Sequence, residues 1–186
     1  MYFLGREKKD MKALLMSADN FEDTELLVPY YRFLEEGIQV DIASMKKDTI
    51  KGKHGYEVEA NKALRDILPD DYDVLLLPGG KAPEAVRKEE KAREIARYFF
   101  ETNRPVFAIC HGPQILISAG LLKGRRATCY KTVAAEMKEA GALYEDKEVV
   151  VDGNLVTSRQ PSDLPVFLRE SMKILKGLAA FRPKAA

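Results

Sequence analysis

The sequence predicts a three-layer α/β sandwich built on a mostly parallel central sheet. The first observation behind this fold class is that short apolar strands alternate with helical patterns over nearly the whole length. The second is a near-continuous apolar run at residues 73–77 (DVLLL), which is typical of a central parallel strand covered on both faces. With 186 residues, of which 46% are apolar, the chain is long enough to bury a core of ordinary size.

The first elements form a βαβ unit. Residues 12–17 (KALLMS) are expected to be a buried strand. Residues 21–36 carry apolar side chains mostly at helical spacing, and Gly37 ends this helix. Residues 39–44 (QVDIAS) are the second strand. A strand, helix and strand in this order predict a parallel pair joined by a right-handed crossover.

The middle of the chain is more irregular. Residues 46–61 are polar and contain two glycines, so we expect loops and a short hairpin there. Residues 64–68 predict a brief helix before the central strand, and Pro78-Gly79-Gly80 ends that strand abruptly.

The second half continues the alternation. The strand at 106–109 (VFAI) is followed by a helix that Gly120 closes, and residues 148–158 predict a hairpin turning at Asp152-Gly153. Ser162 or Asp163 is a plausible N-cap for the last helix. Helices are expected at residues 89–102, 111–119, 132–140 and 164–175.

Composition excludes several classes of protein. A net charge of +1 without a basic face gives no reason to expect nucleic-acid binding, and no apolar run reaches the ~18 residues of a membrane span. Cys110 and Cys129 form no C-x-x-C pair and no metal-ligand spacing, which is typical of the reducing cytoplasm. We expect an N-terminal extension or leader at 1–10, one domain at 11–178 and a C-terminal tail at 179–186.

Cys110 is the strongest candidate for chemistry. It directly follows the strand at 106–109 and precedes a helix, so the thiol occupies a strand-to-helix elbow where the helix dipole favours the thiolate. Gly112 provides clearance at such an elbow, and Pro113 suits a first helical turn. The competing interpretation is that a free cysteine is a small buried apolar residue.

Three other features lie at the carboxyl ends of predicted strands, where ligand sites of such sheets are found. His111 is a candidate general base and acid, or else a polar residue at a helix start. Gly79-Gly80 is either a plain turn or a place where backbone amides approach an oxyanion. Glu22, at the start of the first helix, either compensates the helix dipole or reaches the thiol as a protonated acid that donates to it.

Five blocks in order resemble the PfpI family of the class I glutamine amidotransferase-like superfamily, over roughly residues 11–176. The blocks are Phe21-Glu22-Asp23 with Glu25-Leu26, Leu77-Pro78-Gly79-Gly80, Ala82-Pro83-Glu84, Ala108-Ile109-Cys110-His111-Gly112-Pro113, and Thr157-Ser158-Arg159 with Pro161 and Asp163-Leu164. The late His-x-Glu pair of glutamine amidotransferases is replaced here by Ser158-Arg159-Gln160, which argues against a glutaminase.

The resemblance implies a flavodoxin-like sandwich with Cys110 as nucleophile, Glu22 as its buried partner and His111 as the second catalytic member. It implies that Glu84 completes the site from a neighbouring subunit, that the Gly80 and His111 amides form an oxyanion pocket, and that Tyr130 lies near the site. It also implies a homodimer, or a hexamer built from three dimers, and no cofactor.

Three functions remain open on this basis. The first is a cytoplasmic enzyme acting on reactive carbonyls such as methylglyoxal or on glycated amino groups, as a glyoxalase or deglycase. The second is an ATP-independent cysteine peptidase, because the same Cys-His pair supports acyl transfer to water. The third is a redox-sensing or chaperone-like stress protein in which Cys110 is oxidised, with Cys129 as a second redox-sensitive position.

Overall fold

The computed structural model describes residues 11–180, and the predicted extension at 1–10 and most of the predicted tail lie outside the described residues. A seven-stranded sheet runs through it in the order β10-β11-β7-β6-β1-β2-β5. Every neighbouring pair is parallel except β10 with β11, which confirms the mostly parallel sheet. Its strands are β1 (Lys12–Met16), β2 (Gln39–Ser44), β5 (Lys62–Ala63), β6 (Val74–Leu77), β7 (Val106–Ile109), β10 (Val149–Asp152) and β11 (Leu155–Ser158).

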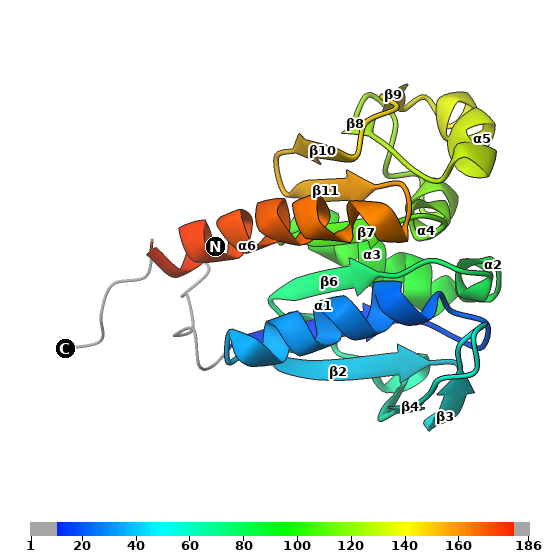
Figure 1. The fold of residues 1–186 in the computed structure, drawn as a ribbon, viewed down its shortest axis with the longest axis vertical. Coiled ribbons are helices and arrows are strands. Elements are labelled where there is room, and N and C mark those ends of the chain that lie inside the picture. Colours follow the sequence, from blue (N-terminus) through cyan, green and yellow to red (C-terminus); the bar gives the residue numbers. More distant parts are fainter. Residues whose placement is uncertain (1–10, 181–186) are drawn as a thin grey trace.

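Helices cover both faces of this sheet. In Figure 1, α1 and α6 lie in front of the strands, while α3 and α4 lie behind them. The helices are α1 (Asp23–Glu35), α2 (Ala82–Val86), α3 (Glu90–Glu101), α4 (Pro113–Ser118), α5 (Ala134–Glu139) and α6 (Leu164–Ala180). Single 3₁₀ turns occupy η2 (Leu64–Asp66), η3 (Pro69–Asp71), η4 (Lys131–Val133) and η5 (Pro161–Asp163).

The central strands are apolar because both of their faces are buried. Each residue of β6 and β7 is fully buried, as parallel strands between two helical layers require. Phe107 of β7 packs edge-on against Phe167 of α6 with ring centroids 6.5 Å apart, which ties the sheet to the front helical layer. Apolar burial of this kind is the main stabilising term of the fold.

Two small sheets flank the main one. The short hairpin predicted within residues 46–61 is present as β3 (Asp48–Lys51) paired antiparallel with β4 (Glu57–Ala60). A second pair, β8 (Arg126–Ala127) with β9 (Leu143–Tyr144), was not predicted. The hairpin matters for function because its loop lies beside the carboxyl end of β1, where Phe21 bridges both Gly52 and Gly80.

Several predicted boundaries shift. The first helix begins at Asp23 rather than Phe21, since Phe21 is held in two β-bridges. The fourth helix begins at Pro113, because Cys110 and the two residues after it form the turn. The last helix continues to Ala180, beyond the expected end at residue 175, and α2 was not predicted at all.

Candidate active site

Cys110 sits on a strained elbow. Its φ is +63°, a left-handed conformation that residues other than glycine rarely adopt. Backbone bonds hold it there: its amide donates to the Ser158 carbonyl (3.0 Å), and its carbonyl accepts from the Tyr130 amide (2.9 Å). The side chain is only 7% exposed. The predicted strand-to-helix elbow is therefore present, and strain maintained in this way is a feature of functional sites.

Two glycines make room for this elbow. A Cβ on Gly112 would overlap the Leu77 carbonyl, so its predicted role in clearance is confirmed. A Cβ on Gly79 would stand 2.6 Å from the Cys110 Cβ and 2.9 Å from Sγ, and it would also overlap Oε2 of Glu25. The thiol and the Glu25 carboxyl therefore lie together directly over Gly79.

Glu25, rather than Glu22, is the carboxyl group beside the thiol, which corrects the placement expected from sequence. Glu25 is completely buried, and its Oε2 accepts a hydrogen bond from the Gly79 amide (2.9 Å). Its Oε1 is buried without a hydrogen-bond partner among residues 11–180, and the Cys110 thiol interacts with this carboxyl group. Burial, and then the charge of Glu22, raise the pKa of Glu25 to about 8, so the carboxyl is mostly protonated at neutral pH.

Glu22 faces the hairpin loop instead. Its carboxylate pairs with Nζ of Lys53 and lies 3.5 Å from Nε2 of His54. The loop is fixed by Asp23, whose two carboxylate oxygens accept from the backbone amides of His54 and Tyr56 (both 3.0 Å). This anchoring keeps Lys53 close to the site. Glu22 raises the pKa of Lys53 most, and the charges of Cys110 and Glu25 raise it further.

The expected low pKa of the thiol is wrong for this structure. Burial raises the pKa of Cys110 to about 12, and a charged Glu25 adds to the increase. The backbone amides of Gly80 and His111 both donate toward the sulfur and act in the opposite direction. The helix after the elbow has only six residues, so its dipole offsets little of the desolvation. The thiol and Glu25 thus form one coupled, buried pair.

His111 lies where a proton acceptor is needed. Its Nδ1 is 3.2 Å from the Cys110 Sγ, and its Nε2 is 3.3 Å from Oγ1 of Thr132. Burial lowers the pKa of His111, and Lys53 lowers it further, whereas Glu84 raises it. A neutral imidazole that accepts at Nδ1 carries its proton on Nε2, facing Thr132.

The other predicted site residues are distributed around this pair. Tyr130 packs its ring against His111, with centroids 5.3 Å apart and planes tilted by 30°. The Gly80 amide faces the sulfur, as expected for an oxyanion pocket, but the Gly79 amide is already bonded to Glu25. Glu84 is an exposed residue of α2, within electrostatic range of His111 of the same chain.

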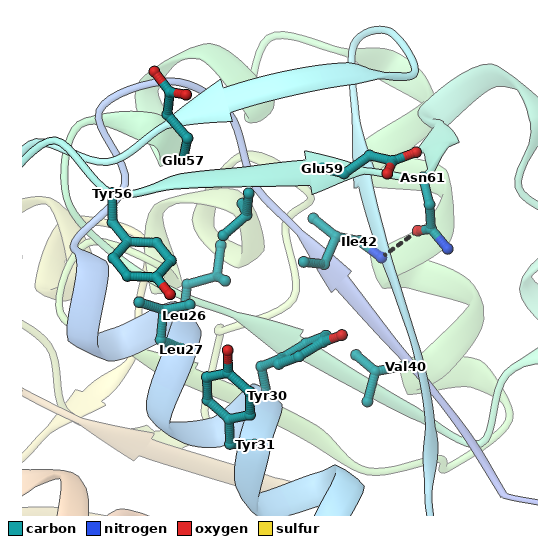
Figure 2. Close-up of a pocket in the computed structure, with 11 residues that line it drawn as sticks. Leu26, Leu27, Tyr30, Tyr31, Val40, Ile42, Tyr56, Glu57, Glu59 and Asn61 are labelled. Atoms are coloured by element: carbon teal, nitrogen blue, oxygen red, sulfur yellow. Dashed lines mark hydrogen bonds between the residues drawn. The ribbon is translucent and has the colours of Figure 1, made fainter.

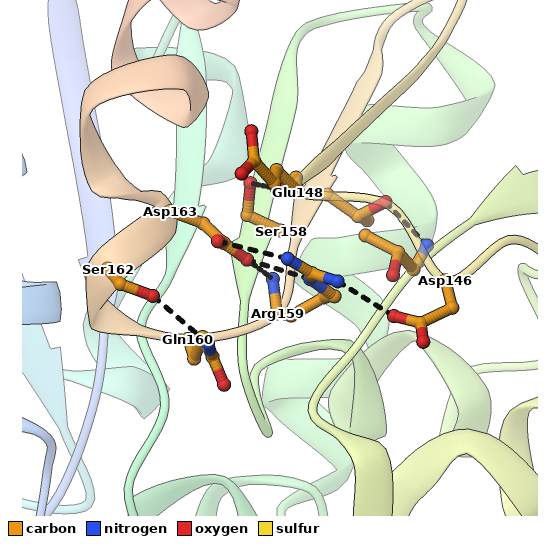
Figure 3. Close-up of polar contacts among 9 residues, drawn as sticks. Asp146, Glu148, Ser158, Arg159, Gln160, Ser162 and Asp163 are labelled. Carbon is orange, nitrogen blue, oxygen red and sulfur yellow. Dashed lines mark hydrogen bonds and ion pairs between the residues drawn. The ribbon is translucent and has the colours of Figure 1, made fainter.

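Arg159 occupies the strand end next to the elbow. Its Nε donates to Oδ2 of Asp163 (3.0 Å), and its Nη1 donates to Oδ1 of Asp146 (2.9 Å), as Figure 3 shows. The Oγ of Ser162 accepts from the Gln160 side chain (3.0 Å), and the Asp163 carboxylate accepts from Arg159, so both predicted cap residues are engaged by groups other than the α6 amides. These contacts hold the 158–163 segment, whose Ser158 carbonyl accepts from the Cys110 amide and so supports the elbow. Residues 158–163 contain no histidine.

Three residues of the site were missed from sequence. The spacing could have indicated that Glu25 is buried, because Glu25 lies four residues before Pro29 and eight before Phe33, on the buried face of α1. Thr132 and Lys53 had none, since each comes from a polar turn whose place depends on tertiary contacts. Within residues 11–180, no group of three or more His, Cys, Asp or Glu could hold a metal ion, and no helix is long and apolar enough to cross a membrane.

Comparisons with known proteins agree with this architecture. The DJ-1/PfpI family profile matches residues 11–174. Deglycase PfpI of Pyrococcus furiosus is 55% identical over 166 residues, which cover 89% of this chain and 100% of that relative. General stress protein 18 of Bacillus subtilis is 43% identical over 159 residues, covering 84% and 92%. The crystal structure of Drosophila melanogaster DJ-1beta superposes with a TM-score of 0.82 at 27% identity, covering 91% of each chain. The chain therefore belongs to the DJ-1/PfpI family, as the resemblance of its five sequence blocks predicted.

Proposed function

We propose that this protein is a cysteine-dependent enzyme of the deglycase type, acting on 2-oxoaldehydes such as methylglyoxal and on their adducts with amino groups. One observation carries the proposal: the Cys110 sulfur, on a strained elbow, lies 3.2 Å from a histidine nitrogen and faces two backbone amides. Similarity to relatives named deglycases supports the substrate class.

The reaction starts with addition of the sulfur to the aldehyde carbon. The new C–S bond forms as the C=O π pair moves to oxygen, and the thiol proton passes to His111 and then to that oxygen, giving a hemithioacetal. The Gly80 and His111 amides that face the sulfur are placed to donate to the developing oxyanion. Glu25, protonated at neutral pH, holds a proton beside the sulfur and donates to it while it is anionic.

The intermediate then rearranges and is hydrolysed. Transfer of hydrogen from the aldehyde-derived carbon to the neighbouring ketone carbon converts the hemithioacetal into a lactoyl thioester. Water cleaves that C–S bond and releases lactate with the free thiol, so methylglyoxal plus water gives lactate. With a hemiaminal adduct, the C–S bond forms at the same carbon as the C–N bond breaks, and the thiol proton passes through His111 to the departing nitrogen. The free amine leaves, and the hemithioacetal follows the same course. His111 serves as base for the attacking water.

The decisive experiment follows methylglyoxal consumption and, in parallel, hydrolysis of a fluorogenic peptide. We expect Cys110→Ala to abolish methylglyoxal consumption while lowering the free energy of unfolding by no more than ~1–2 kcal/mol. Cys129→Ala is the matched control, because Cys129 is also a buried free thiol but, within residues 11–180, forms no hydrogen bond with a histidine. Unchanged consumption in Cys110→Ala would exclude this thiol. Peptide hydrolysis alone would favour the peptidase.

We further infer that Glu84 acts on His111 across a subunit boundary in a homodimer or a trimer of dimers. Its exposure on α2 leaves the carboxylate available to a second copy, where it would add to the electrostatic effect that Glu84 already has on His111 within one chain. Dilution below the dimer dissociation constant should then abolish activity. Full activity in monomers verified by light scattering would place the action of Glu84 within one chain.

A further inference from the structure

An open pocket of about 480 Å³ lies between α2, α3 and α4. Its lining consists of Glu84, Arg87, Lys88, Arg93, Gln114 and Ser118. It differs from a pocket of about 410 Å³ between α1, β2 and β4, whose Glu57 and Glu59 carboxylates point away from the interior in Figure 2. Glu84 acts electrostatically on His111, and the Gln114 amide donates to the His111 carbonyl (3.0 Å), so the first pocket lies next to the active site.

A paired arginine and glutamate joins three helices at this pocket. Arg87 is the C-cap of α2, and its Nη1 donates to Oε2 of Glu136 on α5 (3.3 Å), while its Nη2 pairs with Oε1. The Nε of Arg87 donates to Oγ of Ser118, the last residue of α4 (2.7 Å). The guanidinium therefore holds the carboxylate in a bidentate geometry, which adds direction to the attraction between the charges.

Two further side chains extend this pair into a network. Gln114, in the first turn of α4, donates from Nε2 to Oε2 of Glu136 (3.4 Å). Its Oε1 is buried without a partner, so within residues 11–180 the Gln114 side chain is hydrogen-bonded only to Glu136. Arg93 of α3 donates from Nη1 to the Arg87 carbonyl (2.6 Å). A partly buried network of this kind fixes geometry better than an isolated surface ion pair does.

Two of the helices joined by the Arg87–Glu136 pair continue into contacts of His111. Thr132, whose Oγ1 lies 3.3 Å from Nε2 of the imidazole, comes four residues before Glu136, about one helical turn away. Tyr130, whose ring packs on the imidazole, is the N-cap of the same η4 turn, which runs directly into α5. The other helix is α4, which follows His111 in the chain. The pair therefore joins the elements on two sides of the imidazole.

We propose that Arg87 and Glu136 are positioning residues of the active site. They hold the η4 turn against His111, so that its Nδ1 stays 3.2 Å from the Cys110 sulfur. Lys131 and Thr132 of this turn are exposed, so packing does not fix their side, whereas the buried Val133 keeps the turn attached to the core. The pair thus sets the orientation of the turn. The proposal rests on the proposed function, because the orientation of the imidazole matters when it accepts the thiol proton.

The test variant is Glu136→Ala, because charge and positioning predict opposite changes in the pKa of His111. Burial lowers that pKa, Glu84 raises it and Lys53 lowers it. Loss of the Glu136 carboxylate, which leaves Arg87 without its counter-charge, would lower the pKa further by electrostatics alone. A loosened η4 turn instead admits water to the imidazole and reduces the effect of burial. We therefore expect the pKa of His111 to rise.

The measurement is an NMR titration of the imidazole signals. The chain contains two histidines, and a His54→Gln variant assigns the signal of His111. Arg32→Ala is the matched control, because Arg32 forms a comparable ion pair with Glu36 at the far end of α1. This control should leave the titration of His111 and the turnover of methylglyoxal unchanged.

Turnover of methylglyoxal is measured on the same proteins. A displacement of about 1 Å at a reacting group costs about 100-fold, and buried Val133 limits the movement here, so kcat of Glu136→Ala should fall about tenfold. KM should stay within about twofold, because neither residue of the pair is placed to touch the substrate. The double variant Arg87→Ala/Glu136→Ala should lose no more activity than either single variant, since the pair acts as one unit.

Two outcomes would overturn the proposal. One is a lowered or unchanged pKa of His111 in Glu136→Ala, and the other is a double variant in which the losses of kcat multiply. If Glu136→Ala does not fold at room temperature, Glu136→Gln takes its place, because it keeps the shape of the side chain and one acceptor for Arg87, and the same directions are expected. If wild type itself fails to consume methylglyoxal, the proposed function fails, while the titration of His111 still decides whether the pair positions the imidazole.

Discussion

Replacing Gly79 by alanine tests whether the close approach of the thiol and Glu25 over this residue is essential. An added Cβ would stand 2.6 Å from the Cys110 Cβ, whereas carbon atoms pack best at about 3.5–4.0 Å. Something must therefore move by about 1 Å. The φ of Gly79 is outside the left-handed region, so a loss would report crowding rather than backbone strain.

The size of the effect follows from that displacement. Overpacking a closed site costs about 1–3 kcal/mol, which in a chain of this length lowers Tm by about 2–12 °C. A displacement of about 1 Å at the reacting atoms lowers activity by about 100-fold. We therefore expect Gly79→Ala to lose methylglyoxal turnover and Cys110 alkylation much more than it loses stability.

Gly177→Ala is the matched control. Gly177 lies within α6, and a Cβ there would meet nothing within 4 Å. Because alanine is a better helix former, this variant should be as stable as wild type or up to ~1 kcal/mol more stable, with full activity. A Gly79→Ala protein with wild-type turnover and alkylation rates would refute the packing of the site described above.

Other consequences can be measured separately. Arg159→Ala removes the guanidinium from the carboxylate of Asp163, which is 3% exposed, and should lower the free energy of unfolding in urea by about 3 kcal/mol; a loss below 0.5 kcal/mol would contradict the importance of this pair. Lys53→Met should lower the ratio of iodoacetate to iodoacetamide reactivity at Cys110 about threefold, because it removes a positive charge near the sulfur, and an unchanged ratio would place that charge too far away. The folded-state pKa of Glu25, about 8 against an ordinary 4.5, means that the folded protein keeps a proton that the unfolded chain loses. Its stabilising contribution is complete below about pH 4.5 and lost as the pH rises through 8, so the Tm of wild type relative to Glu25→Gln should fall between pH 5 and 8, and a rise would reverse the sign of the pKa shift.

Much of the fold could be predicted because its signals are local. A strand covered on both faces must be apolar along its length, as residues 74–77 and 106–109 are, and that pattern is visible without any tertiary information. The elements that were missed are short. Helix α2 has five residues with a proline among them, and β8 and β9 have two each, so none spans enough of a period to be detected.

The misplacement of the carboxyl partner has a different cause. Sequence patterns place Glu22 and Glu25 in the same first turn, and a difference of three residues decides which one faces the sheet. That choice depends on Phe21, whose bridges to Gly52 and Gly80 start α1 at Asp23 and rotate Glu25 inward. Both bridges join segments that are far apart in the chain, so no local pattern contains them. The only local sign was an acidic residue at a core position of the helix.

The thiol itself shows why position alone does not determine reactivity. The elbow and the helix start were recognisable from sequence, and both favour an anion, yet burial outweighs them and raises the pKa of Cys110 to about 12. The competing quantities are a desolvation cost of up to several pKa units and the contribution of two amides and a six-residue helix. Activation must therefore come from groups that hold or accept a proton at the sulfur. Because burial keeps Glu25 protonated and His111 neutral at pH 7, proton transfer to His111 can accompany attack on the carbonyl without a stable thiolate in the resting enzyme.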